Sequence, residues 1–150
     1  MKYWQRNEYF KYASFIRECE RAYGIPRDML AILLWDSSQF KQRDIESKHR
    51  HRFGSIGIAN IMHAAGKQWG MIDEQKGRDD RYNPWAAIRA AGTHLATLRG
   101  KMGSWRLAVL AYKWGDENLR IALQAERTEQ YPCPPETLRA TERLLSMVTT

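Results

Sequence analysis

The segment Trp35-Asp36-Ser37-Ser38-Gln39-Phe40 has the clearest chemical potential in this sequence. Cleavage of a glycosidic bond requires a carboxylic acid with a raised pKa, held beside the bond so that it protonates the leaving oxygen. The end of a buried, apolar helix is a good place for such an acid, because burial disfavours the charged form of a carboxyl group. The longest uninterrupted apolar run of the chain, residues 29–35, leads directly into this segment. The sequence therefore predicts an acid position at the end of an apolar helix.

Amide and aromatic side chains elsewhere in the chain are suited to sugar. Asn60 offers an amide donor and acceptor that fit a sugar N-acetyl group. Phe40 and Trp114 offer flat apolar faces for sugar rings, and Asn118 adds a second amide. Tyr112 has the spacing of a core residue, so its position in the helix alone predicts no chemistry for it.

These residues belong to short sequence motifs, which follow one another along the chain in the same order as in a known group of proteins. Trp35 to Phe40 resembles a helix end that reads Glu-Ser-x-Phe, and residues 54–62 resemble Gly-x-x-Gly-Leu-Met-Gln-Ile. Residues 111–118 resemble Ala-Tyr-Asn-Trp-Gly-x-Gly-Asn, with Lys113 and Glu117 replacing the Asn and the second Gly. Residues 88–91 and 134–137 add weaker matches to an Asn-Ile-x-x-Gly helix and to a Pro-x-Glu-Thr segment. Over residues 25–145, the chain resembles the lytic transglycosylase and goose-lysozyme group.

The resemblance implies a mainly helical, lysozyme-like fold with minimal β-structure, in a single domain over residues 1–150. It implies cleavage of the β-1,4 bond between MurNAc and GlcNAc in peptidoglycan, with a 1,6-anhydro product and without a cofactor. The catalytic Glu of the group falls on Ser37, and Tyr112 is implied to place its phenol near that position. The expected substrate-binding residues are Ser38, Phe40, Ile58, Asn60, Met62, Trp114 and Asn118.

Serine at position 37 changes what the chain can do. A hydroxyl group does not titrate near neutral pH, and general acid–base catalysis contributes about 10²- to 10⁴-fold to such a reaction. Asp36 is adjacent, but one step along a helix points a side chain about 100° away. Asp44 and Glu46 in the following loop are better placed, although most loop carboxylates are solvated. We therefore expect the chain as written to bind glycan without cleaving it.

Two explanations of Ser37 are compatible with the sequence. Either a parental Glu was changed to Ser on purpose, or the chain is a natural pseudoenzyme that binds cell wall or serves as a structural phage protein. The same acid serves lytic transglycosylation and hydrolysis, and the lack of a second carboxylate favours transglycosylation.

The spacing of apolar residues predicts a series of helices separated by turns. Gly24 and Pro26 separate a first helix over residues 9–23 from a second, apolar helix that begins at Pro26. Further helices are expected over residues 58–69, from Pro84 to about 103, over 105–114, from 116, and over 136–148. Residues 40–57 read as an irregular loop or small β excursion, and 70–82 as a turn-prone stretch. Asn83 and Ser104 are expected helix caps.

The chain carries a formal net charge of +7, which attracts polyanions of any kind. An alternative hypothesis is a basic helical nucleic-acid-binding domain, with phosphate contacts from Lys41, Arg43, Lys48, Arg50 and Arg52. These residues fall in an expected loop and form no basic helix face, so peptidoglycan glycan is the favoured partner and nucleic acid is not expected.

The remaining features argue for a small protein without metal. Cys19 and Cys133 are expected to be free thiols, and the four histidines match no metal-ligand spacing. No run of apolar residues is long enough to span a membrane, no signal peptide is visible, and a monomer is expected. These features favour a phage-encoded protein, made in the host cytoplasm and acting on the bacterial cell wall as an endolysin or a virion component.

Most other aromatic and charged residues have plain structural interpretations. Trp35, Trp69, Trp85 and Trp105 are expected in the core, since apolar positions of helices are usually buried. Asp79, Asp80 and Arg81 are expected at the surface, because they follow a polar, turn-prone stretch.

Overall fold

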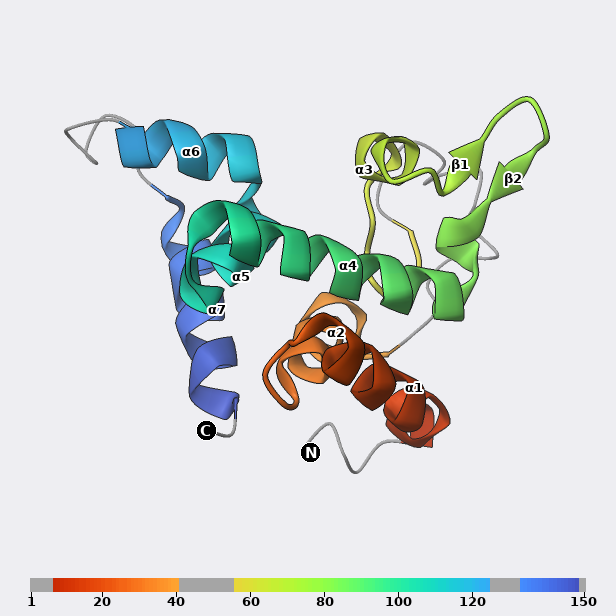
Figure 1. Ribbon diagram of the computed structural model, residues 1–150, viewed down its shortest axis with the longest axis horizontal. Coiled ribbons are helices and arrows are strands. Elements are labelled where there is room, and N and C mark those ends of the chain that lie inside the picture. The colour runs from red at the N-terminus through yellow and green to blue at the C-terminus, as the bar shows by residue number, and fades with distance from the viewer. Residues whose placement is uncertain (1–6, 41–55, 125–132, 149–150) are drawn as a thin grey trace. The chain divides into compact units, whose positions relative to one another are not determined.

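The computed structural model describes residues 7–40, 56–124 and 133–148, and these are mainly helical with one small hairpin (Figure 1). This confirms the expected fold class. In chain order the elements are α1 (Asn7–Tyr23), α2 (Met29–Ser38), α3 (His63–Gln68), β1 (Ile72–Asp73), β2 (Arg78–Asp79), the 3-10 helix η2 (Asp80–Tyr82), α4 (Pro84–Met102), α5 (Trp105–Trp114), α6 (Asp116–Gln124) and α7 (Pro135–Met147).

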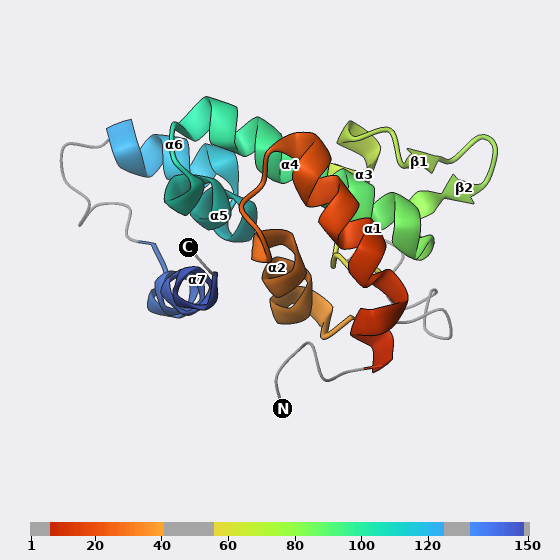
Figure 2. The ribbon, with the colours of Figure 1, turned by 60° about the horizontal axis from the view of Figure 1, so that its bottom comes forward.

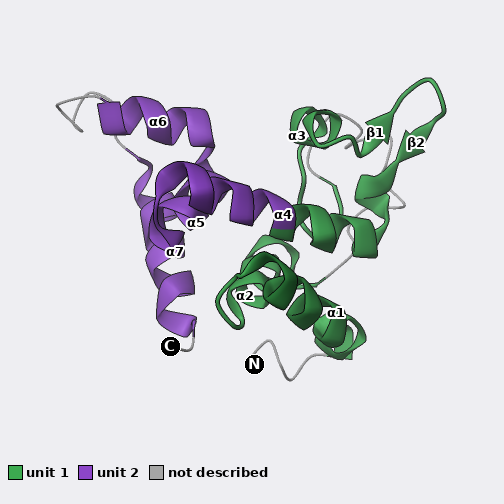
Figure 3. Ribbon diagram, in the orientation of Figure 1, with its two compact units in different colours: residues 1–92 green, residues 93–150 purple. Residues whose placement is uncertain are grey.

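The chain forms two compact units, residues 1–92 and residues 93–150. Helix α4 belongs to both, as the change of colour along it in Figure 3 shows. Unit 1 contains α1 to η2 and the first half of α4, and unit 2 contains the second half of α4 and α5 to α7.

Helix α2 is the centre of unit 1. Every residue from Met29 to Leu34 is at most 2% exposed, as expected for a helix that is apolar on all sides. Helix α1 packs beside it, which is visible in both ribbon views (Figure 1, Figure 2). The side chains of Ile16, Ile58 and Ile88 complete this core, each at most 1% exposed.

The start of α2 differs from the expectation that Pro26 opens the helix. Asp28 has a left-handed backbone, with φ 70°, so the helix begins only at Met29. The Glu20 carboxylate of α1 accepts hydrogen bonds from the backbone N–H groups of Asp28 at 3.1 Å and Leu30 at 3.0 Å. The first N–H groups of a helix have no partner inside it, and here a side chain of another helix supplies one. Glu20 is itself 1% exposed.

Residues 56–62 form a tight turn instead of the expected first turns of a helix. Ile56 and Ile61 pair as an isolated antiparallel bridge, with N–H to oxygen distances of 3.0 and 3.1 Å. Gly57 and Asn60, with φ 84° and 54°, have left-handed backbones that cannot continue a right-handed helix. Helix α3 therefore starts at His63 and is shorter than the sequence predicted.

The turn-prone stretch after α3 contains a β-hairpin. Strands β1 and β2 pair antiparallel, with Ile72 opposite Asp79 and Asp73 opposite Arg78. The strands then lead through η2 to Asn83, whose side chain accepts the N–H of Trp85 at 3.0 Å and caps α4 as predicted.

Unit 2 follows the expected boundaries closely. The Ser104 hydroxyl accepts the N–H of Leu107 at 3.2 Å and begins α5, and Gly115, with φ 104°, ends it. Helix α5 packs against α6 and α7. On α7, Thr141 and Leu144 are buried, whereas Leu138 is 37% exposed.

The structure also bears on the remaining expectations. Cys19 and Cys133 are free thiols, as predicted, and Cys19 is buried. In the described ranges, no helix has both the length and the apolar character needed to cross a membrane. Nor do these ranges hold three or more His, Cys, Asp or Glu side chains grouped so as to bind a metal ion.

We predict that Glu20→Ala lowers the free energy of unfolding by about 1–3 kcal/mol, because it leaves buried N–H donors at the start of α2 without an acceptor. The matched control is Glu18→Ala, which removes an exposed carboxylate of the same helix and should change stability by less than about 0.5 kcal/mol. Urea unfolding measures both. Equal effects of the two substitutions would contradict the capping role.

Titration of Glu20 should also make stability depend on pH. Burial, partly offset by the hydrogen bonds from Asp28 and Leu30, raises the pKa of the Glu20 carboxyl above its ordinary value. A raised folded pKa gives a contribution that is complete below the unfolded pKa of about 4.3 and is lost as the pH rises through the folded pKa. The unfolding free energy of the unmodified chain should therefore fall relative to Glu20→Gln between pH 4 and 7. A difference that is constant or grows with pH would show this assignment to be wrong.

Candidate functional site

Position 37 lies in the last turn of α2, where the sequence placed the acid. The Ser37 side chain is half-buried, and its hydroxyl donates to the Leu33 carbonyl of the same helix at 2.8 Å. Asp36, its neighbour, is exposed. Asp44 and Glu46, the other carboxylates considered from the sequence, lie outside the described residues.

Ser38 connects the end of α2 to the turn at residues 56–62. Its side chain is 1% exposed, and its hydroxyl hydrogen-bonds the Ile58 carbonyl and lies 3.2 Å from the Leu34 carbonyl. The Ile58 contact joins two segments 20 residues apart in the sequence. Position 37 and the turn that carries Asn60 are thus held together by a buried hydrogen bond.

The backbone on both sides of this contact is strained. Gln39, Phe40 and Asn60 have φ values of 56°, 61° and 54°, in a region that residues other than glycine seldom occupy. Only one further non-glycine residue of the described chain, Asp28, has a positive φ. Such conformations cost about 1–3 kcal/mol each and gather at functional sites. We call Ser38, Gln39, Phe40 and the turn 56–62 the α2 frame.

Three of the expected substrate contacts are buried, namely Ser38, Phe40 and Ile58. Phe40 is 1% exposed, and its ring centroid lies 5.6 Å from that of Tyr9 and 5.8 Å from that of Trp35. Ile58 is 0% exposed. None of these three side chains presents a surface, so a contact of any of them with sugar stays a prediction. Their burial fixes the α2 frame from inside.

Asn60 and Met62 do lie at the surface. The Asn60 side chain is exposed at the tip of the turn, where its backbone N–H donates to the Gly57 carbonyl at 3.1 Å. Met62 is 54% exposed and has an extended backbone at the start of α3. An exposed amide and an exposed apolar side chain thus stand next to each other at the edge of the α2 frame.

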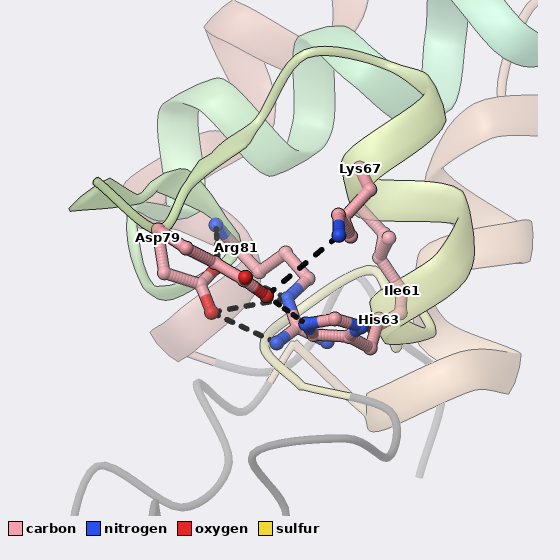
Figure 4. A network of polar contacts seen from close by, with 6 residues as sticks. Ile61, His63, Lys67, Asp79 and Arg81 are labelled. Carbon is pink, nitrogen blue, oxygen red and sulfur yellow. Dashed lines mark hydrogen bonds and ion pairs between the residues drawn. The ribbon is translucent and has the colours of Figure 1, made fainter. Parts of the chain in front are cut away.

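A buried arginine, which the sequence placed at the surface, anchors the same turn. Arg81 is 0% exposed, and its guanidinium donates to both carboxylate oxygens of Asp79, with the shortest contact at 2.8 Å. It also donates to the Ile61 carbonyl at 3.2 Å, so it joins the hairpin to the α2 frame (Figure 4). Nothing in the periodicity reveals this role, because a charged triplet after a polar loop also fits a solvated surface.

A second polar contact ties the hairpin to α3. Glu74 is in the turn between the strands. Its Oε1 atom lies 3.3 Å from the Nε2 atom of His63 and 3.8 Å from the Nζ atom of Lys67. Figure 4 shows His63 and Lys67 on the helix that follows Ile61. The hairpin thus contacts α3 through Glu74, in addition to the contact of Arg81 with Ile61.

Unit 2 carries the remaining predicted residues. Tyr112 of α5 is half-buried, and its ring centroid lies 5.6 Å from that of His94 in α4. Burial raises the pKa of the Tyr112 phenol well above its usual range, and burial also lowers the pKa of His94. The phenol therefore keeps its proton, and the imidazole is neutral, at ordinary pH.

Trp114 and Asn118 lie where α5 gives way to α6. Trp114 is half-buried, and the Asn118 side-chain amide donates to its carbonyl at 2.8 Å. A side chain added at Gly115 would lie 3.4 Å from the same Asn118 amide nitrogen. Asn118 thus stabilises the turn between the two helices.

Two comparisons with known proteins bear on this arrangement. The sequence model of a family described as the transglycosylase SLT domain matches residues 14–132. This range includes α2, the α2 frame and residues 111–118. Peptidoglycan transglycosylase gp16 of Escherichia phage T7 is 30% identical over 120 residues, which make up 79% of this chain. The chain spans only 9% of the length of that phage protein.

We predict that Arg81→Met lowers the free energy of unfolding by about 3 kcal/mol, because it leaves the Asp79 carboxylate without its buried partner. The control, Arg78→Met, removes a 51% exposed arginine of the same hairpin and should cost less than about 1 kcal/mol. Chemical denaturation of both variants tests this. If Arg78→Met is as destabilising as Arg81→Met, burial is not what makes Arg81 important.

Proposed function

The chain belongs to the transglycosylase SLT domain family, and from this premise we propose that it binds the glycan strands of peptidoglycan at the α2 frame. We propose further that position 37 is the acid position, so that the chain as written binds without cleaving. Asn60 and Met62 are the surface contacts of this proposal in unit 1. Tyr112, Trp114 and Asn118 are kept as its proposed site residues in unit 2.

The main observation in support of glycan binding is that the α2 frame, whose backbone is strained, lies beside Ser37. Three non-glycine residues with positive φ and a buried hydrogen bond surround the end of α2. A site of this kind lowers stability, so its presence beside Ser37 supports a retained binding role.

A carboxyl group at position 37 would have the environment that an acid needs. It would sit in the last turn of a helix, where the negative end of the helix dipole disfavours a carboxylate, beside the buried Leu33 and Leu34. Both effects raise a carboxyl pKa above about 4.3. The acid would protonate the leaving oxygen and then, as a base, take the proton of the sugar 6-hydroxyl that closes the 1,6-anhydro ring. Serine can do neither.

The biological setting is proposed from the relative. Gp16 is named a peptidoglycan transglycosylase and comes from a phage, which supports a phage-encoded chain that acts on the bacterial cell wall as an endolysin or virion component. The basic residues of the nucleic-acid hypothesis, Lys41 to Arg52, lie outside the described residues, and no described contact favours that hypothesis.

We predict that Ser37→Glu releases 1,6-anhydro-muropeptides from purified murein, whereas the chain as written and Ser37→Gln release none. Gln has nearly the same size as Glu but has no acidic proton. This control therefore separates the effect of acid catalysis from the effect of side-chain shape. Product release by the glutamate variant should exceed that of the others by at least about 10²-fold. Mass spectrometry of the soluble fraction identifies the anhydro product and distinguishes it from a hydrolysis product.

The same murein preparation tests binding. The unmodified chain should sediment with insoluble murein and remain bound at salt concentrations that release basic proteins from duplex DNA. Turnover by the unmodified chain would refute the acid assignment. A chain that does not sediment with murein would refute the binding role.

A further inference from the structure

Trp85 is the most exposed tryptophan of the described chain, with 41% of its surface accessible. The sequence predicted it in the core, and this is wrong. It is the second residue of α4, directly after Pro84, where the helix emerges from η2. A single exposed aromatic side chain is common on protein surfaces, so what distinguishes Trp85 must come from its neighbours.

Neighbouring rings hold the Trp85 side chain in place. Its ring centroid lies 5.0 Å from that of Tyr12 and 5.4 Å from that of Phe15, with interplanar angles of 68° and 87°. Its backbone is fixed by the hydrogen bond to Asn83. An aromatic group that is already immobile loses little further conformational freedom when it binds a ligand.

Two positive side chains flank these rings. The Arg89 guanidinium lies 5.5 Å from the centroid of Phe15, and the Lys11 ammonium lies 5.5 Å from that of Tyr12. Both distances are in the range of cation–π contacts, which hold a cation beside a ring. The indole of Trp85 is thus exposed and held in place, and a positively charged side chain lies beside each of the two rings that it packs against.

We propose that Trp85, Arg89 and Lys11 form an accessory site for peptidoglycan, distinct from the α2 frame. A pyranose ring of the glycan packs its apolar C–H face on the indole, and the carboxylates of the stem peptides meet the two cations. This inference rests on the proposed function for its ligand class.

Helix α1 connects this accessory site to the α2 frame within unit 1. Tyr9 packs on Phe40 of the frame, and Tyr12, about one turn later, packs on Trp85. A polymer bound at the frame therefore has a second surface available on the same helix. Two contacts on one strand add avidity that a short fragment does not gain.

The test compares Trp85→Ala and Trp85→Phe with the unmodified chain for retention on insoluble murein. Trp85→Ala should weaken retention about threefold to tenfold, and Trp85→Phe less, because a smaller flat ring remains. The matched control is Phe10→Ala, which removes another exposed aromatic residue of unit 1, 65% exposed, and should have no effect.

Charge is tested with Arg89→Gln. It should weaken retention on murein that carries stem peptides and leave the affinity for neutral chitooligosaccharides unchanged. Equal loss for both ligands would contradict the proposed role of the cation.

Direct contact is read from the unmodified chain, which removes any dependence on folding of the variants. The Trp85 indole N–H signal, assigned with Trp85→Phe, should shift when soluble peptide-bearing glycan fragments are titrated. An indole signal that does not move, or a Trp85→Ala chain retained as well as the unmodified one, would overturn the accessory site.

Failure of the accessory site can be distinguished from failure of the proposed function. In the Ser37→Glu background, Trp85→Ala should leave the release of anhydro product from short fragments unchanged and slow only the attack on insoluble murein. If Ser37→Glu is inactive but Trp85→Ala still weakens retention, the acid assignment fails and the accessory site stands.

Discussion

The burial of α2 from Met29 to Leu34 is the constraint on which the rest of unit 1 depends. Backbone groups at the buried start of a helix cannot be satisfied with water, so other segments must supply the partners. At its start, the carboxylate of Glu20 receives two backbone N–H groups. At its end the direction is reversed, because the Ser38 hydroxyl donates to the Ile58 carbonyl and so links the helix to the turn. The polar groups that terminate α2 therefore also position the candidate site.

The hairpin extends this support away from α2. Arg81 is buried because it holds the Ile61 carbonyl and the Asp79 carboxylate together, and this joins the hairpin to the turn that presents Asn60. Glu74 adds an outer contact to His63. Ser38, Phe40 and Ile58, which were expected to contact sugar, fit the same scheme, since their buried side chains support the surface from below. The parts of the α2 frame that hold the geometry are buried, and the parts that face a ligand are few.

The side chain at position 37 takes no part in the described contacts that hold the α2 frame. The shape of the site is set by backbone strain and by buried contacts that do not involve the position 37 side chain, whose hydroxyl bonds only its own helix among the contacts described here. Under the proposed function, the same contacts would hold a glycan-binding surface whether or not position 37 carries a carboxyl group.

The sequence by itself determined the helical class, the ends of α1, α4 and α5, and the segment in which the acid position is proposed, because apolar periodicity, caps such as Asn83 and Ser104, and short ordered motifs are local properties. Only the tertiary structure decided which side chains are exposed. Glu20 shares a helical face with Ile16, which could have revealed its burial. Arg81 and Trp85 gave no such signal, because their environments come from Ile61, Tyr12 and Phe15, far away in sequence. The segment from Trp35 to Phe40 combines a local and a tertiary property. Its motif can be read from the sequence alone, but the burial of Phe40 arises from contact with α1.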